Sequence, residues 1–220
     1  MAFFISKTME FLPQTINNYS ICYTEKEPQL LAELNRETWA NVMTPRMISG
    51  HMQGRILSMI SKMISPENII EIGTYTGYSA LCLVEGLKKN GRLHTFDINE
   101  EYTAVAKRYF NKSDYHDRIQ QHIGNALDMI PDLDANFQLA FIDADKENYS
   151  SYFDLIIDKM DVGGYIIADN VLWSGKVTKK QRDEETEALH QYNKKALADK
   201  RVETLLLPVR DGLMISRKVK

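Results

Sequence analysis

Two short segments in the C-terminal half combine acidic residues with other side chains that can take part in chemistry. Asp143 and Asp145 follow an apolar run and precede Lys146, and Asp169 and Asn170 directly follow a second apolar run. Such runs indicate buried strands, and open α/β sheets hold their ligands just beyond the carboxyl ends of the strands. Asp143, Asp169 and Asn170 would then offer three oxygen donors to a small divalent cation, with the basic Lys146 beside them.

A glycine-containing loop follows another apolar run upstream, with the sequence Glu71-Ile-Gly-Thr-Tyr-Thr-Gly-Tyr-Ser79. Gly73 allows a sharp turn and a close approach to a ligand. Asp97 ends the next predicted strand, where a carboxylate can accept hydrogen bonds from ribose hydroxyls. The spacing is not G-x-G-x-x-G, and Glu71 would repel a diphosphate but suits a cationic ligand. These features favour a nucleoside with a positively charged tail, which describes S-adenosylmethionine.

Four further residues near these segments are candidates for contacts or for packing. Ala126 follows Gly124-Asn125 after a third predicted strand, and its small side chain would admit an adenine ring. Trp173 would either wall an acceptor pocket or pack between a loop and a helix. Tyr149 and Tyr152 are expected to pack on a helix face rather than to contact substrate.

Composition places the chain among ordinary globular proteins. The 220 residues are 44% hydrophobic and 26% charged with a net charge of −3, which gives no overall attraction to nucleic acid or anionic membranes. Cys22 and Cys82 lie far apart, so we expect neither a disulfide nor a thiolate metal site. The five histidines show no H-x-x-x-H pairing that would indicate zinc. With no signal peptide or membrane span expected, we predict a cytoplasmic location.

Short apolar runs alternate with helical patterns along most of the chain, which predicts an α/β fold with a parallel sheet and helices on both faces. The predicted strands are 68–72, 92–96, 119–123, 139–142 and 165–168. The predicted helices are 28–64, 77–87, 100–110, 149–160 and 178–197. A turn at 209–212 between apolar runs 202–208 and 213–217 predicts a terminal antiparallel hairpin. The residues up to about Glu27 are expected to form a loose cap or an oligomer contact.

At these motifs the sequence resembles the metal-dependent class I O-methyltransferases of the caffeoyl-CoA and catechol type. The resemblance runs from about Met43 to Arg217, and it is most specific at 71–79, 141–146 and 168–175. It implies a single Rossmann-like domain over 43–220, with a seven-stranded mostly parallel sheet, preceded by an N-terminal helical cap or oligomer segment over 1–42. It also implies S-adenosylmethionine and Mg²⁺, Mn²⁺ or Ca²⁺ as cofactors and a homodimer.

The resemblance further implies roles for individual residues. Lys146 would be the catalytic base. The metal ligands would be Asp143, Asp169 and Asn170. The cofactor site would be lined by Met47, Ser49, Glu71, Gly73, Thr74, Ser79, Asp97, Ala126, Asp143 and Asp145. The segment 47–54 aligns with a family segment that closes over the cofactor, and an acid is frequent in the family where Gln53 stands.

Several functions stay open at this point. The leading hypothesis is methylation of a hydroxyl on a catechol-like small molecule, slightly favoured over 5-hydroxyuridine in tRNA. The tRNA hypothesis depends on bacterial relatives with an ending similar to 207–216, and on the basic run 176–182, which could meet phosphates. A nicotinamide-dependent dehydrogenase would share the sheet and Asp97, but it leaves Asp169 and Asn170 unexplained. A non-catalytic nucleoside-binding module is the remaining alternative.

Overall fold

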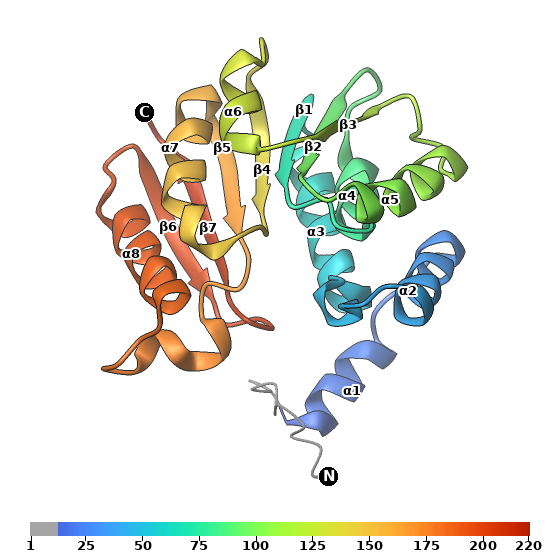
Figure 1. Ribbon diagram of the computed structural model, residues 1–220, viewed down its shortest axis with the longest axis horizontal. Coiled ribbons are helices and arrows are strands. Elements are labelled where there is room, and N and C mark those ends of the chain that lie inside the picture. Colours follow the sequence, from blue (N-terminus) through green and yellow to red (C-terminus); the bar gives the residue numbers. More distant parts are fainter. Residues whose placement is uncertain (1–12) are drawn as a thin grey trace.

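The structure is a computed structural model that describes residues 13–220, and a seven-stranded sheet lies at its centre (Figure 1). The strands are β1 (Asn68–Ile72), β2 (Arg92–Asp97), β3 (Ile119–Ile123), β4 (Phe137–Ile142), β5 (Met160–Ala168), β6 (Val202–Leu207) and β7 (Leu213–Lys218). Their order is β3-β2-β1-β4-β5-β7-β6. Strands β1 to β5 pair in parallel, whereas β7 is antiparallel to both β5 and β6. The predicted α/β sheet with a C-terminal antiparallel hairpin is confirmed.

Helices cover both faces of this sheet. The α-helices are α1 (Gln14–Cys22), α2 (Gln29–Asn41), α3 (Gly50–Ile64), α4 (Tyr78–Leu83), α5 (Glu100–Lys112), α6 (Ala126–Met129), α7 (Tyr149–Lys159) and α8 (Glu184–Ala198). Short 3₁₀ turns are η1 (Pro45–Met47), η2 (Val84–Gly86), η3 (Ile130–Asp132), η4 (Lys146–Asn148) and η5 (Trp173–Thr178). Because strand side chains alternate between faces, Leu139 and Phe141 of β4 pack with helices α2 to α5, and Ala140 and Ile142 pack with α6 to α8.

The prediction of one helix over 28–64 is wrong, because this region forms α2, η1 and α3 in succession. Val42 leaves the helical region with φ −109° and ψ 136°. Thr44 precedes Pro45, whose ring disfavours helical geometry in the residue before it. Gly50 then takes a left-handed φ of 73° where α3 begins. The break matters for function because it turns residues 42–49 into a connecting segment that carries the predicted cofactor contacts.

Among the other element boundaries, the largest differences from the prediction are at the starts of β5 and α8. Strand β5 begins at Met160 rather than at residue 165, because the glycines at 163 and 164 interrupt the apolar pattern from which strands are predicted. Helix α8 begins after Asp183, whose Oδ1 accepts a hydrogen bond of 2.9 Å from the Thr186 amide, rather than at residue 178. A side chain that accepts from the first free amides of a helix fixes where that helix begins.

The N-terminal part of the described chain is helical and exposed. Helix α1 contains no buried residue. A loose cap or an oligomer contact was predicted for the residues up to about Glu27, and the first twelve of these lie outside the described residues. Within residues 13–220, no helix is long and apolar enough to cross a membrane.

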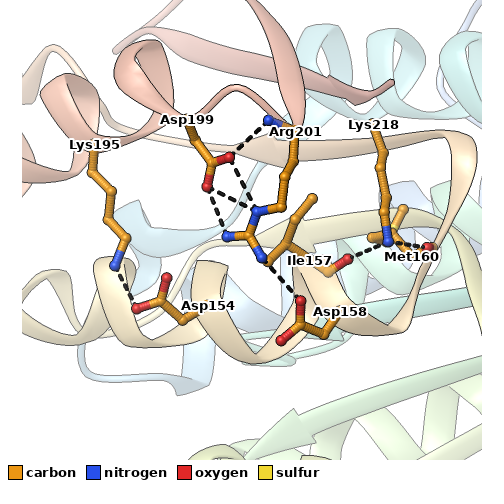
Figure 2. A network of polar contacts seen from close by, with 8 residues as sticks. All are labelled: Asp154, Ile157, Asp158, Met160, Lys195, Asp199, Arg201 and Lys218. Carbon is orange, nitrogen blue, oxygen red and sulfur yellow. Dashed lines mark hydrogen bonds and ion pairs between the residues drawn. The ribbon is translucent and has the colours of Figure 1, made fainter. Parts of the chain in front are cut away.

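A polar network joins α7 to α8 and to the end of β7 (Figure 2). Ion pairs connect Arg201 to Asp158 at 2.9 Å and to Asp199 at 2.7 Å, and another connects Lys195 to Asp154. Lys218 donates to the carbonyls of Ile157 and Met160, both at 2.8 Å, at the C-terminal end of α7, where free carbonyls attract a cation. These contacts fasten the last turns of the helix whose first residue is Tyr149.

A pair of histidines lies on the sheet between β2 and β3. His94 and His122 stack with ring centroids 5.4 Å apart, and a 3.1 Å hydrogen bond joins His94 Nδ1 and His122 Nε2. Burial, then the neighbouring His122 and Arg92, lower the pKa of His94 from its ordinary 6.5 to about 4. Burial also lowers the pKa of His122. Both rings therefore favour the neutral form in the folded protein.

We predict from this pair that the free energy of unfolding decreases as the pH falls from about 6.5 towards 4. Below the ordinary histidine pKa, these histidines bind protons in the unfolded state but not in the folded state. Lowering the pH therefore favours unfolding. Allowing for partial access of solvent, the loss is about 1–2 kcal/mol. Urea unfolding between pH 7 and pH 4 measures it, and His94→Gln should flatten the profile. An unchanged slope in that variant would show that other groups cause the acid sensitivity.

Candidate active site

Asp143 and Asp169 lie next to each other because β4 and β5 are neighbouring parallel strands. Ile142 and Ala168 are paired in register, so each acid is the first residue after its strand. The Asp143 amide donates to Ile72 and the Asp169 amide donates to Ile142, both at 2.9 Å, which holds the two backbones in place. Burial, together with the charge of Asp143, raises the pKa of Asp169 to about 7, and the residue is only 3% exposed. The site therefore concentrates negative charge away from water.

Lys146 on η4 is buried at the centre of this site. Its Nζ donates to Asp143 Oδ1 at 3.0 Å, to Asn170 Oδ1 at 3.0 Å and to the Tyr149 hydroxyl at 2.8 Å. It also lies 5.6 Å from the centre of the Trp173 ring, which itself packs against the hydrophobic core. Two of the three predicted metal-ligand oxygens thus converge on one point that already holds a positive charge.

Tyr149 packs in the core as predicted, and its hydroxyl in addition belongs to the site. The ring lies against Tyr192 with centroids 5.5 Å apart. The hydroxyl accepts from Lys146 and donates to the Asp169 carbonyl at 3.1 Å. Burial, then the charges of Asp143 and Asp169, raise its pKa well above the ordinary value, so it stays a neutral donor. The sequence signal for this role was the three-residue spacing from Lys146.

Two further residues reach the site from distant parts of the chain, and sequence analysis assigned neither to it. Gln53 in the first turn of α3 is 2% exposed, and its Nε2 donates to Asp169 Oδ2. Asp211, in the turn between β6 and β7, accepts at 2.5 Å from the Ser174 amide. Burial raises the pKa of Asp211, and the charge of Lys146 partly offsets this rise. One signal for Gln53 was present in the sequence, namely that it stands where the resembled family frequently has an acid.

The loop after β1 lies directly against the segment after β4. Gly73 has a φ of 104°, and a Cβ there would lie 1.9 Å from the Asp143 carbonyl oxygen. Only glycine allows both this backbone conformation and this approach. The predicted cofactor loop and the predicted metal ligand Asp143 are therefore in backbone contact.

Glu71 at the end of β1 is fully buried below this loop. Its Oε2 accepts at 2.6 Å from Thr95, whose hydroxyl also contacts that of Thr74 at 2.5 Å. Burial raises the pKa of Glu71 to about 8, although Ser79 and Thr95 lower it. Among the described residues, nothing forms a hydrogen bond with Glu71 Oε1. A buried carboxylate oxygen left free in this way fits the amine of a cationic ligand.

The other predicted cofactor residues lie around the same edge of the sheet. Asp97 accepts from the Tyr75 amide at 2.7 Å and from the Asn99 amide at 2.9 Å. Asp145 accepts at 2.5 Å from Tyr152. Ala126 is buried at the start of α6, Ser49 is buried just before α3, and Met47 in η1 is 55% exposed. Within residues 13–220, no hydrogen bond joins these last three to the remaining predicted site residues.

The donor set fits a hard divalent cation. The described residues contain no group of three or more His, Cys, Asp or Glu arranged for a metal, and the candidate set consists of two carboxylates and one amide. Such oxygen donors are those that Mg²⁺ and Ca²⁺ prefer. Lys146 already shows that Asp143 and Asn170 can share one cation.

Comparisons with known proteins agree with this fold. The chain resembles a methyltransferase of Podospora anserina, solved with S-adenosylhomocysteine, with a TM-score of 0.87 and 26% identity over 96% of this chain and 99% of that one. For an O-methyltransferase of Bacillus cereus, solved in complex with S-adenosylhomocysteine, the TM-score is 0.86 and the identity is 26%, over 93% of this chain and 97% of that one. The fold and these matches thus define a class I S-adenosylmethionine-dependent methyltransferase.

Sequence relatives narrow this class to a family. The O-methyltransferase family profile matches residues 20–219. Caffeoyl-CoA O-methyltransferase of Mesembryanthemum crystallinum is 35% identical over 88% of this chain and 81% of its own length. Caffeoyl-CoA O-methyltransferase 5 of Nicotiana tabacum is 33% identical over 88% of this chain and 86% of its own length. The chain belongs to the O-methyltransferase family and is an S-adenosylmethionine-dependent enzyme, which decides against the dehydrogenase and the non-catalytic module.

We predict that Gly73→Ala destabilises the protein far more than Gly163→Ala. Both glycines have a left-handed φ, which disfavours alanine by about 1–2 kcal/mol. A Cβ at 163 comes no closer than 3.8 Å to another residue, whereas one at 73 overlaps the Asp143 carbonyl. We expect a difference of about 2 kcal/mol or more in the free energy of unfolding, measured in urea. If both variants lost the same free energy of unfolding, the close approach of Gly73 to Asp143 would not contribute to stability.

We also predict opposite results for two tyrosine-to-phenylalanine substitutions in one packed pair. Tyr149→Phe removes an acceptor from Lys146 and a donor from the Asp169 carbonyl, at a cost of about 1–3 kcal/mol in the free energy of unfolding. The buried Tyr192 hydroxyl has no hydrogen-bond partner among the described residues, so Tyr192→Phe should be neutral or stabilising. Thermal unfolding of both variants checks this, and a similar loss in both would reduce Tyr149 to a packing role.

Proposed function

We propose that this enzyme transfers the methyl group of S-adenosylmethionine to a hydroxyl of a catechol-like small molecule, with a divalent cation held by Asp143, Asp169 and Asn170. The observation that carries the proposal is the convergence of Asp143 and Asn170 on the buried Nζ of Lys146, with Asp169 adjacent. Oxygen donors and a base then lie at one edge of the sheet, beside the loop of the methyl donor.

The residues around Gly73 would bind the methyl donor, which supplies the transferable methyl group on a sulfonium. The free Oε1 of Glu71 suits the donor's ammonium, and Asp97 suits its ribose hydroxyls. The backbone contact of Gly73 with Asp143 would bring this donor next to the acceptor site. A fixed alignment of donor and acceptor can contribute about 7–11 kcal/mol in favourable reactions, so positioning is the main task of this loop.

Asp143, Asp169 and Asn170 would hold the cation, which when bound acts as a Lewis acid and as a template for two neighbouring oxygens of the acceptor. Gln53 and the Asn170 amide fix the Asp169 carboxylate, the latter at 2.7 Å. Donors on both oxygens keep that carboxylate in one orientation. The protein therefore presents preformed ligands rather than flexible ones.

Lys146 would act as the base. In its neutral form, Nζ would take the proton of the acceptor hydroxyl, and the ammonium formed would be held by Asp143, Asn170 and Tyr149. These contacts favour the charged product of the proton transfer. Lys146 is 8% exposed, so its position is fixed by packing as well as by hydrogen bonds. A base of this kind contributes about 10²–10⁴-fold to a rate.

Two observations favour a small acceptor over tRNA. The two sequence relatives named above are caffeoyl-CoA O-methyltransferases, and caffeoyl-CoA is a small molecule. In the basic run 176–182, Lys176 pairs with Asp183 at 3.3 Å and Arg182 pairs with Glu187 at 3.1 Å. These acids reduce the positive field that phosphates would meet. A homodimer, a cytoplasmic location and the division into a segment 1–42 and a domain 43–220 remain predictions.

Chelation tests the cation directly. We predict that exhaustive chelation abolishes methylation of a catechol and that Mg²⁺ or Mn²⁺ restores it. Asp169→Asn should weaken Mn²⁺ binding, measured by calorimetry, at least about tenfold because it removes a charged ligand. The matched Asp154→Asn on the surface of α7 should bind as the unaltered protein does. Full turnover after chelation would contradict the proposal. Transfer of a labelled methyl group from S-adenosylmethionine to tRNA, but not to catechols, would change the acceptor class.

The base is tested by separating turnover from donor binding. We predict that Lys146→Ala lowers kcat by about 10²–10⁴-fold and leaves the affinity for S-adenosylhomocysteine within about threefold. Lys195→Ala, which removes a partly exposed lysine paired with Asp154, should change neither quantity. An unaltered kcat in Lys146→Ala would remove this residue from the role of base.

A further inference from the structure

The segment from Thr44 to Gln53 connects the two halves of the site. At its beginning, the Tyr75 hydroxyl donates to the Thr44 carbonyl at 3.0 Å. Tyr75 belongs to the loop over residues 71–79, which we expect to bind the methyl donor and call the donor loop, and its amide donates to Asp97 at 2.7 Å. At its end, Gln53 donates to Asp169 Oδ2. We call residues 44–53 the bridging segment, because one end is bonded to the donor loop and the other end to a predicted metal ligand.

Besides the bonds at its two ends, the bridging segment has a contact of 3.3 Å between the Thr44 and Tyr102 hydroxyls and one of 2.7 Å between His51 Nε2 and the Glu25 carbonyl oxygen. It contains the short turn η1, the left-handed Gly50 and the largely exposed Met47. Ile48 and Ser49 are buried, so the segment nevertheless packs on the domain. Of its hydrogen bonds, those of the Thr44 carbonyl and of Gln53 reach residues of the two halves of the site, so each half can influence the segment through them.

Gln53 is suited to this connection by its chemistry. An ionised carboxylate at position 53 could not donate to Asp169, and it would add a third negative charge next to Asp143 and Asp169. The amide supplies a donor without a charge. It reaches Asp169 from a helix 116 positions away in the sequence, and it is 2% exposed, so water does not compete for the bond.

We infer that Gln53 is a positioning residue that couples the donor site to the cation site through the bridging segment. A bound cation would restrain the Asp169 carboxylate further than its two hydrogen bonds do, and Gln53 would pass this restraint to the start of α3 and the segment before it. The donor, which we expect to contact Met47 and Ser49, meets a segment that is already ordered and binds more tightly. Coupling of two binding equilibria is reciprocal, so the donor also strengthens cation binding by the same factor. The inference rests on the proposed function.

Calorimetry on the full chain measures the coupling. The affinity for S-adenosylhomocysteine is determined without and with saturating Mn²⁺, in the unaltered protein and in Gln53→Met, which keeps the side-chain volume but cannot donate. We expect Mn²⁺ to raise the affinity about fivefold or more in the unaltered protein and less than twofold in Gln53→Met. Gln138→Met is the matched control, because Gln138 also donates to an aspartate, Asp161, away from the site. It should keep the full coupling.

A second variant and a second readout make the result independent of folding defects. Tyr75→Phe removes the bond at the other end of the bridging segment and should also reduce the coupling. Hydrogen exchange should show that Mn²⁺ alone slows the amides of residues 44–53 in the unaltered protein but not in Gln53→Met.

The outcomes separate this inference from the proposed function. Full coupling in Gln53→Met, or none in an unaltered protein that binds both ligands, overturns the inference and leaves the proposed function intact. Failure of the unaltered protein to bind Mn²⁺ defeats the proposed function and the inference with it.

Discussion

The site depends on one electrostatic constraint: two carboxylates must lie side by side where water is largely excluded. Parallel pairing of β4 with β5 brings Asp143 and Asp169 to the same level of the sheet edge, and burial with mutual repulsion raises the pKa of Asp169 to about 7. Such a pair is stable only with positive charge or donors around it. Lys146 supplies the charge in this structure, and a divalent cation would supply more.

Much of the surrounding structure serves this constraint. Gly73 lets the donor loop approach the Asp143 backbone, and the Tyr149 hydroxyl holds both Lys146 and the Asp169 carbonyl. Gln53 supplies an uncharged donor to the Asp169 carboxylate. The loop around Gly73, the side chain of Lys146 and the connecting segment before α3 therefore meet at the same two acids. A change in any one of them is expected to alter how the others are held.

The sequence predicted the parts of the molecule that depend on local patterns. Apolar runs located the core strands, and the polar residues directly after two of them indicated Asp143, Asp169 and Asn170. The helix predicted over 28–64 failed because apolar spacing continues across Pro45 and Gly50, where the backbone turns. The contact of Gln53 with Asp169 spans 116 positions, so no local pattern could predict it. The free oxygen of Glu71 likewise appears only when the strands are packed.

A crystal structure of the full chain grown with Mn²⁺ and S-adenosylhomocysteine tests the central claim most directly. The account predicts an anomalous scattering peak in contact with the side-chain oxygens of Asp143, Asp169 and Asn170, with the homocysteine sulfur facing it across Gly73. A bound S-adenosylhomocysteine with no peak among these three side chains, or a peak at another place, would contradict it.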